Sequence, residues 1–203
     1  MFLCVNPGRH ELTVKRSEFI AFSYMIDGRD EVKAHIKELR ERFCDARHVC
    51  HAFIADENGD DFGYDDDGEP SGTAGKPIYS ALEMSGARRS MIAVVRYFGG
   101  IKLGAGGLTR AYRESATGLI ESAGLARAER RAEYSVSCPF DGYKRISAIA
   151  RGANIKTENI IYSDKVRFTL TAPAETDVSS MLAPFGAAVE KSGERFVICE
   201  DIK

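Results

Sequence analysis

A basic, glycine-rich segment contains the residue types best suited to bind a charged ligand. Five glycines lie between Gly99 and Gly107, and the stretch 88–113 carries six arginines and lysines with no aspartate or glutamate. Glycine-rich backbone can turn its N–H groups toward one point, and a helix N-terminus adds partial positive charge there. We therefore expect an anion site for phosphates of a nucleotide or of RNA. Its candidate residues are Lys76, Arg96, Lys102, Gly104, Gly106, Gly107, Arg110 and Arg113.

The same segment also has a purely structural interpretation. Glycines allow a helix to pack closely on a sheet, and Arg110 can pair with Glu114 at i,i+4. The known nucleotide-binding motifs do not fit. Thr109 stands where the dinucleotide motif requires its third glycine, and Pro70 stands where a P-loop ending in Gly75-Lys76 requires a glycine. Neither motif can be assigned.

An acidic segment precedes the basic one. From Asp56 to Glu69 there are eight acidic residues and no basic residue. Three roles are open to these carboxylates: binding a hard cation such as Mg²⁺, forming a hydrated loop, or reaching across to the basic segment at 88–113. The EF-hand spacing is absent, so we expect no metal site. The candidate residues of this acidic loop are Asp66, Asp67, Glu69, Ser71 and Thr73.

No pattern in the sequence indicates a catalytic nucleophile. Ser71 and Thr73 lie among glycines but not in a Gly-x-Ser-x-Gly motif. On a strand, His48 and Cys50 project to one face and His51 to the other, so the three side chains do not converge on one metal ion. We expect no catalytic residue and no cofactor.

A buried strand and a long helix must position the glycine-rich segment. Met91–Val95 is a continuous apolar run, typical of a central strand. From Leu108 to Gly124 the apolar residues recur at helical spacing. Upstream, the patterns predict a strand at 11–26, a helix at 30–43, a strand at 48–55, a long loop or hairpin at 56–75 and a short helix at 78–84.

The last third of the chain shows a second pattern, following a polar connector at 125–131. We expect strands at 133–138, 154–162 and 165–172, helices at 141–151 and 175–185, and a final strand ending near 195–199. This βαββαβ order is typical of a ferredoxin-like split βαβ unit. We therefore predict two domains, 1–130 and 131–203.

Composition limits the class of protein. The chain has 203 residues, 44% of them hydrophobic, and a formal net charge of -2, which excludes a disordered or fibrous chain. No apolar run approaches the roughly 20 residues of a membrane helix. No secretory signal is visible, and the five cysteines contain no Cys-x-x-Cys pair, so we expect reduced thiols and a cytoplasmic location.

Two longer motifs resemble a known family. Asp-Asp-Gly-Glu-Pro-Ser-Gly-Thr-Ala-Gly-Lys-Pro-Ile begins at Asp66, and Val-Val-Arg-Tyr-Phe-Gly-Gly-Ile-Lys-Leu-Gly-Ala-Gly-Gly-Leu-Thr-Arg-Ala-Tyr begins at Val94. Both look like signatures of the IMPACT/YigZ family, and blocks at 15–21 and 46–53 resemble earlier parts of it. Arg47 and Val49 stand where the family more usually has small or polar residues.

The resemblance implies an α+β fold in two parts. The first is the fold shared by a ribosomal small-subunit protein, domain IV of elongation factor G and the GHMP kinases. The second is a ferredoxin-like domain that looks like domain V of elongation factor G. Such likeness points toward the ribosome or structured RNA, although fold alone does not establish activity.

Three functions follow as expectations. The first is a non-catalytic, translation-associated binding protein that contacts RNA, the ribosome or a translation-regulatory protein, with RNA contacts that are local and salt-sensitive because the net charge is only -2. The second is an enzyme of unknown reaction that binds a phosphate or nucleotide ligand in the glycine-rich segment, with Asp66, Asp67 or Glu69 as its metal-binding or acid–base partner. The third is docking of a regulatory protein on the acidic loop, since eukaryotic members of the family act by protein contact.

Overall fold

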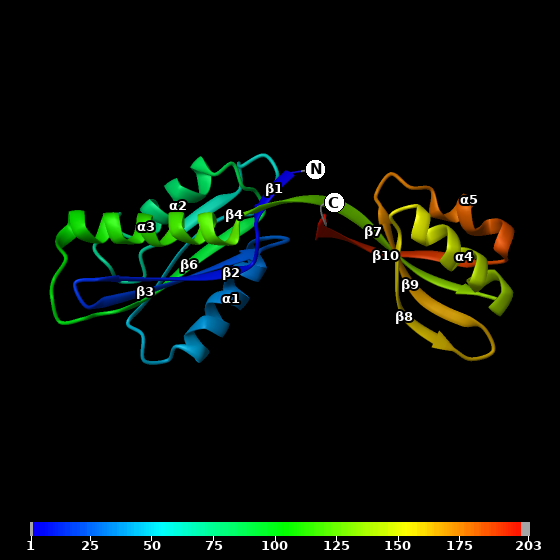
Figure 1. Cartoon of the computed structure of the whole chain (residues 1–203), viewed down its shortest axis with the longest axis horizontal. Helices are drawn as coiled ribbons and strands as arrows, with labels where there is room; N and C mark the ends of the chain where they lie inside the picture. Colours follow the sequence, from blue (N-terminus) through cyan, green and yellow to red (C-terminus); the bar gives the residue numbers. More distant parts are fainter. Residues whose placement is uncertain (1, 200–203) are drawn as a thin grey trace. The chain divides into compact units, whose positions relative to one another are not determined.

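Two compact units make up the part of the chain that the structure describes, residues 2–199 (Figure 1). The structure is a computed structural model. One unit spans Phe2–Arg127, and the other begins at Ala128. Strand β7 (Leu125–Cys138) passes from the first unit into the second. Among the described residues, no helix is long and apolar enough to cross a membrane.

An antiparallel sheet of five strands forms the centre of the N-terminal unit. Its order is β2-β3-β6-β4-β5, and every neighbouring pair is antiparallel. The expected central strand is confirmed: β6 is buried from Ser90 to Arg96 because both faces of the sheet are covered. The strands are β2 (Gly8–Val14), β3 (Ser17–Met25), β4 (His48–Ile54), β5 (Phe62–Asp65) and β6 (Ser90–Tyr97).

Helices cover both faces of this sheet (Figure 1). On one face, α1 (Arg29–Arg42) places Val32 and Leu39 in a core with alternate residues of β3, β4 and β6. On the other face, α2 (Gly75–Met84) and α3 (Gly104–Ala123) pack their apolar sides on the remaining residues of the same strands. The alternation of side chains along each strand therefore supplies two separate cores.

The expected single strand at 11–26 is wrong. It is a hairpin of β2 and β3, in which Val14 pairs with Ser17 and only Lys15 and Arg16 form the turn. Both turn residues have positive φ, 45° and 67°. Two-residue hairpin turns with positive φ at both positions normally contain Asn-Gly. This turn contains Lys-Arg instead, so the sequence contained no signal of a turn at this place.

Two other boundaries differ from the expectations. Helix α3 begins at Gly104 rather than Leu108, so the second half of the glycine-rich segment is the first helical turn. Of the two alternatives expected for 56–75, the structure shows the hairpin, because this stretch contains β5, which pairs with β4. The connector at 125–131 is part of β7, because its residues from Ala128 pair with β10 (Ala188–Ile198).

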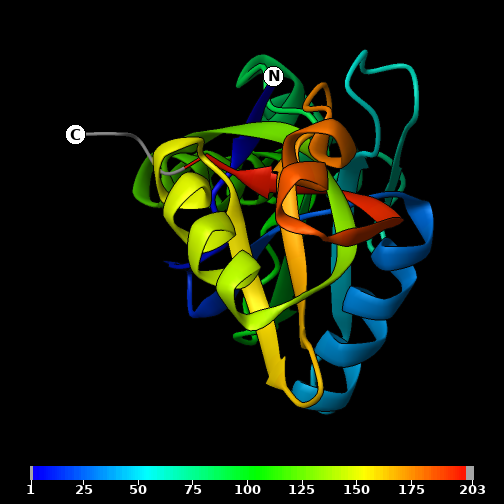
Figure 2. The ribbon, with the colours of Figure 1, turned by 90° about the vertical axis from the view of Figure 1, so that its right-hand side faces the viewer.

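The C-terminal unit has the expected βαββαβ order. Its sheet runs β10-β7-β9-β8 in antiparallel pairs, whereas β1 (Phe2–Val5), which also pairs with β7, belongs to the N-terminal unit. Its helices lie on one face of the sheet and share a core with Val136, Phe168 and Leu170 (Figure 2). The remaining elements are α4 (Phe140–Gly152), β8 (Lys156–Tyr162), β9 (Val166–Pro173), α5 (Val178–Leu182) and a 3-10 turn at Ala183–Phe185.

The hairpin turn makes a direct prediction about stability. The double variant Lys15→Asn/Arg16→Gly should raise the free energy of unfolding by about 1–2 kcal/mol, because left-handed backbone disfavours side chains other than Asn and Gly. Urea unfolding followed by circular dichroism measures this change. The variant Lys15→Ala/Arg16→Ala serves as the control and should not stabilise the protein, since alanine retains the left-handed penalty. Equal stability of the Asn-Gly variant and the wild type would contradict the assigned turn.

Candidate functional site

The candidate residues gather where β6 ends. At this end of the N-terminal unit β3 and β4 begin, because Glu18 pairs with Tyr97 and His48 pairs with Arg96. Helix α3 starts seven residues after β6. The acidic loop reaches the same place through contacts of Asp67 with His48 and of Glu69 with Arg96, and Asp66 joins the loop to the start of α2. The two segments singled out in the sequence are therefore neighbours in the fold.

A buried ion pair joins the acidic and basic segments. Arg96 donates from Nη1 to Oε1 of Glu69 at 2.5 Å, and both side chains are less than one-tenth exposed. The hydroxyl of Tyr112 donates to the same oxygen at 2.8 Å. Of the three roles left open for the acidic segment, the structure shows the contact with the basic segment. Arg96 is thus an internal partner of Glu69 and does not face solvent.

The groups next to this pair remain protonated. Burial raises the pKa of the Tyr112 hydroxyl and of the Cys50 thiol well above their usual values. The Cys50 Sγ lies 3.3 Å from the Tyr112 hydroxyl. A thiol of this kind is a poor nucleophile because the reactive species is the thiolate.

Asp66 is held by backbone donors of its own loop. Its carboxylate accepts hydrogen bonds from the N–H groups of Gly72, Ala74 and Gly75 at 2.7–2.9 Å. Desolvation raises the pKa of Asp66, but these three hydrogen bonds outweigh it and leave the pKa below its usual range. Since Gly75 is the first residue of α2, Asp66 caps that helix from nine residues upstream.

The other acidic-loop candidates divide between internal and exposed positions. The Asp67 carboxylate accepts from Arg40 and from the backbone N–H of Val49. Thr73 is buried and donates to the carbonyl of Pro70 at 2.6 Å, whereas Ser71 is exposed. Within residues 2–199 no group of three or more His, Cys, Asp or Glu side chains is arranged to hold a metal ion.

The other basic candidates are exposed. Across the described part of the chain, the side chains of Lys76, Lys102, Arg110 and Arg113 make no ion pair or hydrogen bond, and the alternative pair of Arg110 with Glu114 is not formed. Gly104, Gly106 and Gly107 occupy the first turn of α3, which contains no acidic residue. The partial positive charge of this helix end is therefore not compensated within its own turn.

Two cations that the sequence patterns did not indicate also lie at this site. Lys15 and Arg16 are exposed in the β2–β3 turn. A Cβ added at Gly99 would lie 2.0 Å from the Arg16 carbonyl group, so the turn and the glycine-rich segment are in direct backbone contact. Figure 1 shows both at the same end of the sheet. Knowing that β3 pairs with β6 would have predicted this contact. The periodicity of the sequence does not specify which strands pair, so this signal was not available.

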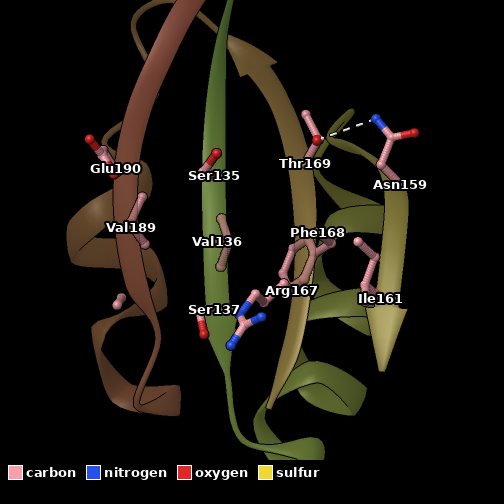
Figure 3. Close-up of a pocket in the computed structure, with 11 residues that line it drawn as sticks. Ser135, Val136, Ser137, Asn159, Ile161, Arg167, Phe168, Thr169, Val189 and Glu190 are labelled. Atoms are coloured by element: carbon pink, nitrogen blue, oxygen red, sulfur yellow. Dashed lines mark hydrogen bonds between the residues drawn. The ribbon is translucent and has the colours of Figure 1, made fainter. Parts of the chain in front are cut away.

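A groove of about 410 Å³ lies on the sheet of the C-terminal unit (Figure 3). It is lined by Ser135 and Ser137 of β7, Arg167 and Thr169 of β9, and Asn159 of β8. These residues alternate with the core residues Val136 and Phe168, so the groove is on the face away from α4 and α5. No candidate residue from the sequence analysis lies in this groove.

Comparisons with known proteins give consistent results. Residues 15–120 match the family model of the Impact N-terminal domain. IMPACT family member YigZ of Escherichia coli (strain K12) is 35% identical over 85% of this chain and 86% of its own length. IMPACT family member YvyE of Bacillus subtilis (strain 168) is 32% identical over 88% of this chain and 83% of its own length. A crystal structure of a hypothetical protein is 31% identical, with a TM-score of 0.64 and 98% of both chains covered.

The buried ion pair is expected to dominate the stability of this site. Glu69→Ala should lower the free energy of unfolding by about 3–5 kcal/mol, because Arg96 would remain buried without a partner. Denaturant unfolding measures the loss. Glu41→Ala, which removes an exposed pair with Lys37, is the control and should change stability by less than about 1 kcal/mol. A similar small loss for both variants would show that the Glu69 pair is not buried in solution.

The cap formed by Asp66 should depend on pH. At pH 7, Asp66→Asn should lower the free energy of unfolding by about 1–2 kcal/mol. A carboxylate with a depressed pKa stabilises the fold above its unfolded pKa and loses that contribution as the pH falls through its folded pKa. The difference between wild type and variant should therefore shrink below about pH 4. Urea midpoints measured between pH 7 and pH 3 test this, and a constant difference would contradict it.

Proposed function

Because this chain belongs to the IMPACT family, we propose that it is a non-catalytic, translation-associated binding protein whose N-terminal unit contacts RNA phosphates. The observation that carries the proposal is a group of exposed cations at the end of the sheet where α3 begins. We call this group the basic surface. It consists of Lys15, Arg16, Lys76, Lys102, Arg110 and Arg113.

The electrostatics of the basic surface favour phosphate. The neighbouring carboxylates of Asp66, Asp67 and Glu69 already accept hydrogen bonds from backbone N–H groups or arginines. The cations therefore remain available to a ligand, and the N–H groups in the first turn of α3 add donors beside them. Binding should be local and salt-sensitive, since the whole chain carries a net charge of -2.

Binding at this surface requires no chemical step. The side chains buried beneath it, Cys50 and Tyr112, stay protonated at neutral pH because burial raises both pKa values. A nucleotide-binding enzyme would need a base or nucleophile beside the phosphates, and the neighbouring carboxylates of Asp66, Asp67 and Glu69 are engaged by backbone N–H groups or arginines. The proposal therefore assigns binding roles to the basic surface and no catalytic residue.

The fold adds support at the level of architecture. Within this proposal, the N-terminal unit corresponds to domain IV of elongation factor G and the C-terminal unit to domain V. The antiparallel β10-β7-β9-β8 sheet with both helices on one face is compatible with the second assignment. Resemblance to two modules of a translation factor favours RNA of the ribosome over an unrelated nucleic acid, by analogy alone.

Charge reversal on α3 tests the proposal. Arg110→Glu/Arg113→Glu should abolish co-sedimentation with purified ribosomal particles at low salt and reduce affinity for ribosomal RNA at least tenfold. The slope of log affinity against log salt is negative, and it should become less negative by about 2 because two phosphate contacts are lost. Sucrose-gradient sedimentation and fluorescence polarisation at several salt concentrations measure these changes.

A matched variant controls for overall charge. Lys33→Glu/Lys37→Glu makes the same change in net charge at exposed positions of α1, on the opposite face of the sheet from α3. It should keep co-sedimentation within about twofold of wild type, because contact charges outweigh distant, screened ones. Equal losses in the two double variants, or unchanged sedimentation of the α3 variant, would overturn the proposal.

A further inference from the structure

The β2–β3 turn contains two cationic residues in a backbone conformation that is disfavoured for residues with a side chain. Lys15 and Arg16 have φ values of 45° and 67°, a region where L-residues with a side chain are disfavoured. Asn-Gly would suit this turn better. Neither side chain forms an ion pair or hydrogen bond with another residue between 2 and 199. The fold therefore gains nothing from their charges, which points to a role in contact with something outside the chain.

The turn is fixed against the segment that follows β6. Gly99 packs on the backbone of Arg16 with no room for a Cβ, and its N–H donates to Ser17 Oγ at 3.2 Å. Arg96 also reaches Ser17 Oγ, at 3.5 Å. The residue before Gly99 is thereby held at a set position beside the two cations.

That residue is an exposed aromatic. Phe98 is 45% exposed, although it directly follows the buried strand β6. The guanidinium of Arg96 lies 5.7 Å from its ring centroid and supports it by a cation–π contact. Arg96 is in turn held by Glu69, so the ring rests on a rigid base. Lys102 and the half-exposed Ile101 follow in the same segment.

We propose that this place binds an unpaired nucleotide of RNA. The base stacks on Phe98, and the flanking phosphates contact Lys15, Arg16 and Lys102. An aromatic platform between cations suits single strands, because a duplex buries the faces of its bases. The inference rests on the proposed function and adds a preference: loops and single strands bind at this surface, and continuous duplex binds more weakly.

Binding of two RNA probes tests this preference. A labelled 12-nucleotide single strand should bind at least tenfold more tightly than a duplex of the same length at equal salt. Phe98→Leu keeps the apolar bulk but removes the aromatic platform, so it should weaken single-strand binding about tenfold and leave duplex binding unchanged. Phe62→Leu is the matched control, since Phe62 is 41% exposed on β5, outside the basic surface. It should alter neither affinity.

Fluorescence gives a direct readout of stacking. The chain contains no tryptophan, so Phe98→Trp introduces a single reporter. Its emission should be quenched by the single strand and not by the duplex, whereas Phe62→Trp should respond to neither. The turn variant Lys15→Asn/Arg16→Gly should weaken single-strand binding severalfold and reduce the salt slope by about 2, although it is expected to be more stable.

The outcomes separate the two proposals. Equal affinity for both probes, with no effect of Phe98→Leu, would overturn the single-strand inference. The proposed function would still be supported if Arg110→Glu/Arg113→Glu lost its affinity for RNA. Absence of binding to either probe by the wild type would overturn both. A selective loss of single-strand binding in Phe98→Leu and a quenched Phe98→Trp signal would support the inference.

Discussion

The ion pair between Glu69 and Arg96 holds together three elements that are distant in the sequence. Glu69 belongs to the loop before α2, Arg96 to the central strand, and Tyr112 to α3, and all three meet at one carboxylate oxygen. Both charged groups are almost fully removed from water, so each is tolerated only in the presence of the other. The geometry of the loop, of the segment after β6 and of the start of α3 depends on this contact.

One consequence is a separation of charge at this end of the N-terminal unit. The carboxylates of Asp66 and Asp67 accept from backbone N–H groups, and Asp67 also accepts from Arg40. The carboxylates of Asp66, Asp67 and Glu69 are therefore engaged inside the fold, and of the three roles that the composition left open, Glu69 makes the contact with the basic segment. The cations around the start of α3 have no such partners among the described residues and form the surface on which the proposed function rests.

The same end of the N-terminal unit carries two features that do not favour stability. The β2–β3 turn places Lys15 and Arg16 in left-handed backbone, and Phe98 exposes an aromatic ring to water. Both are adjacent to the rigid network, since Gly99 packs on Arg16 and Arg96 supports Phe98. A rigid base beneath strained and exposed groups is characteristic of binding sites, where stability is lost locally to place side chains toward a ligand.

Local pattern was enough to predict the central strand, the long helix, the βαββαβ order of the second unit and the family. Each depends on residues close together in the chain: an apolar run at Met91–Val95, helical spacing after Leu108, and the motifs around Asp66 and Val94. The tertiary structure alone decided which charges are paired. Arg96 and Arg110 look alike in the sequence, yet one is buried against Glu69 and the other is exposed. Periodicity indicates the environment of residues that are close together in the chain. The ion pair joins Glu69 and Arg96, which are 27 positions apart, and the hairpin contact joins Ser17 and Gly99, which are 82 positions apart. Only the packed fold brings such residues together.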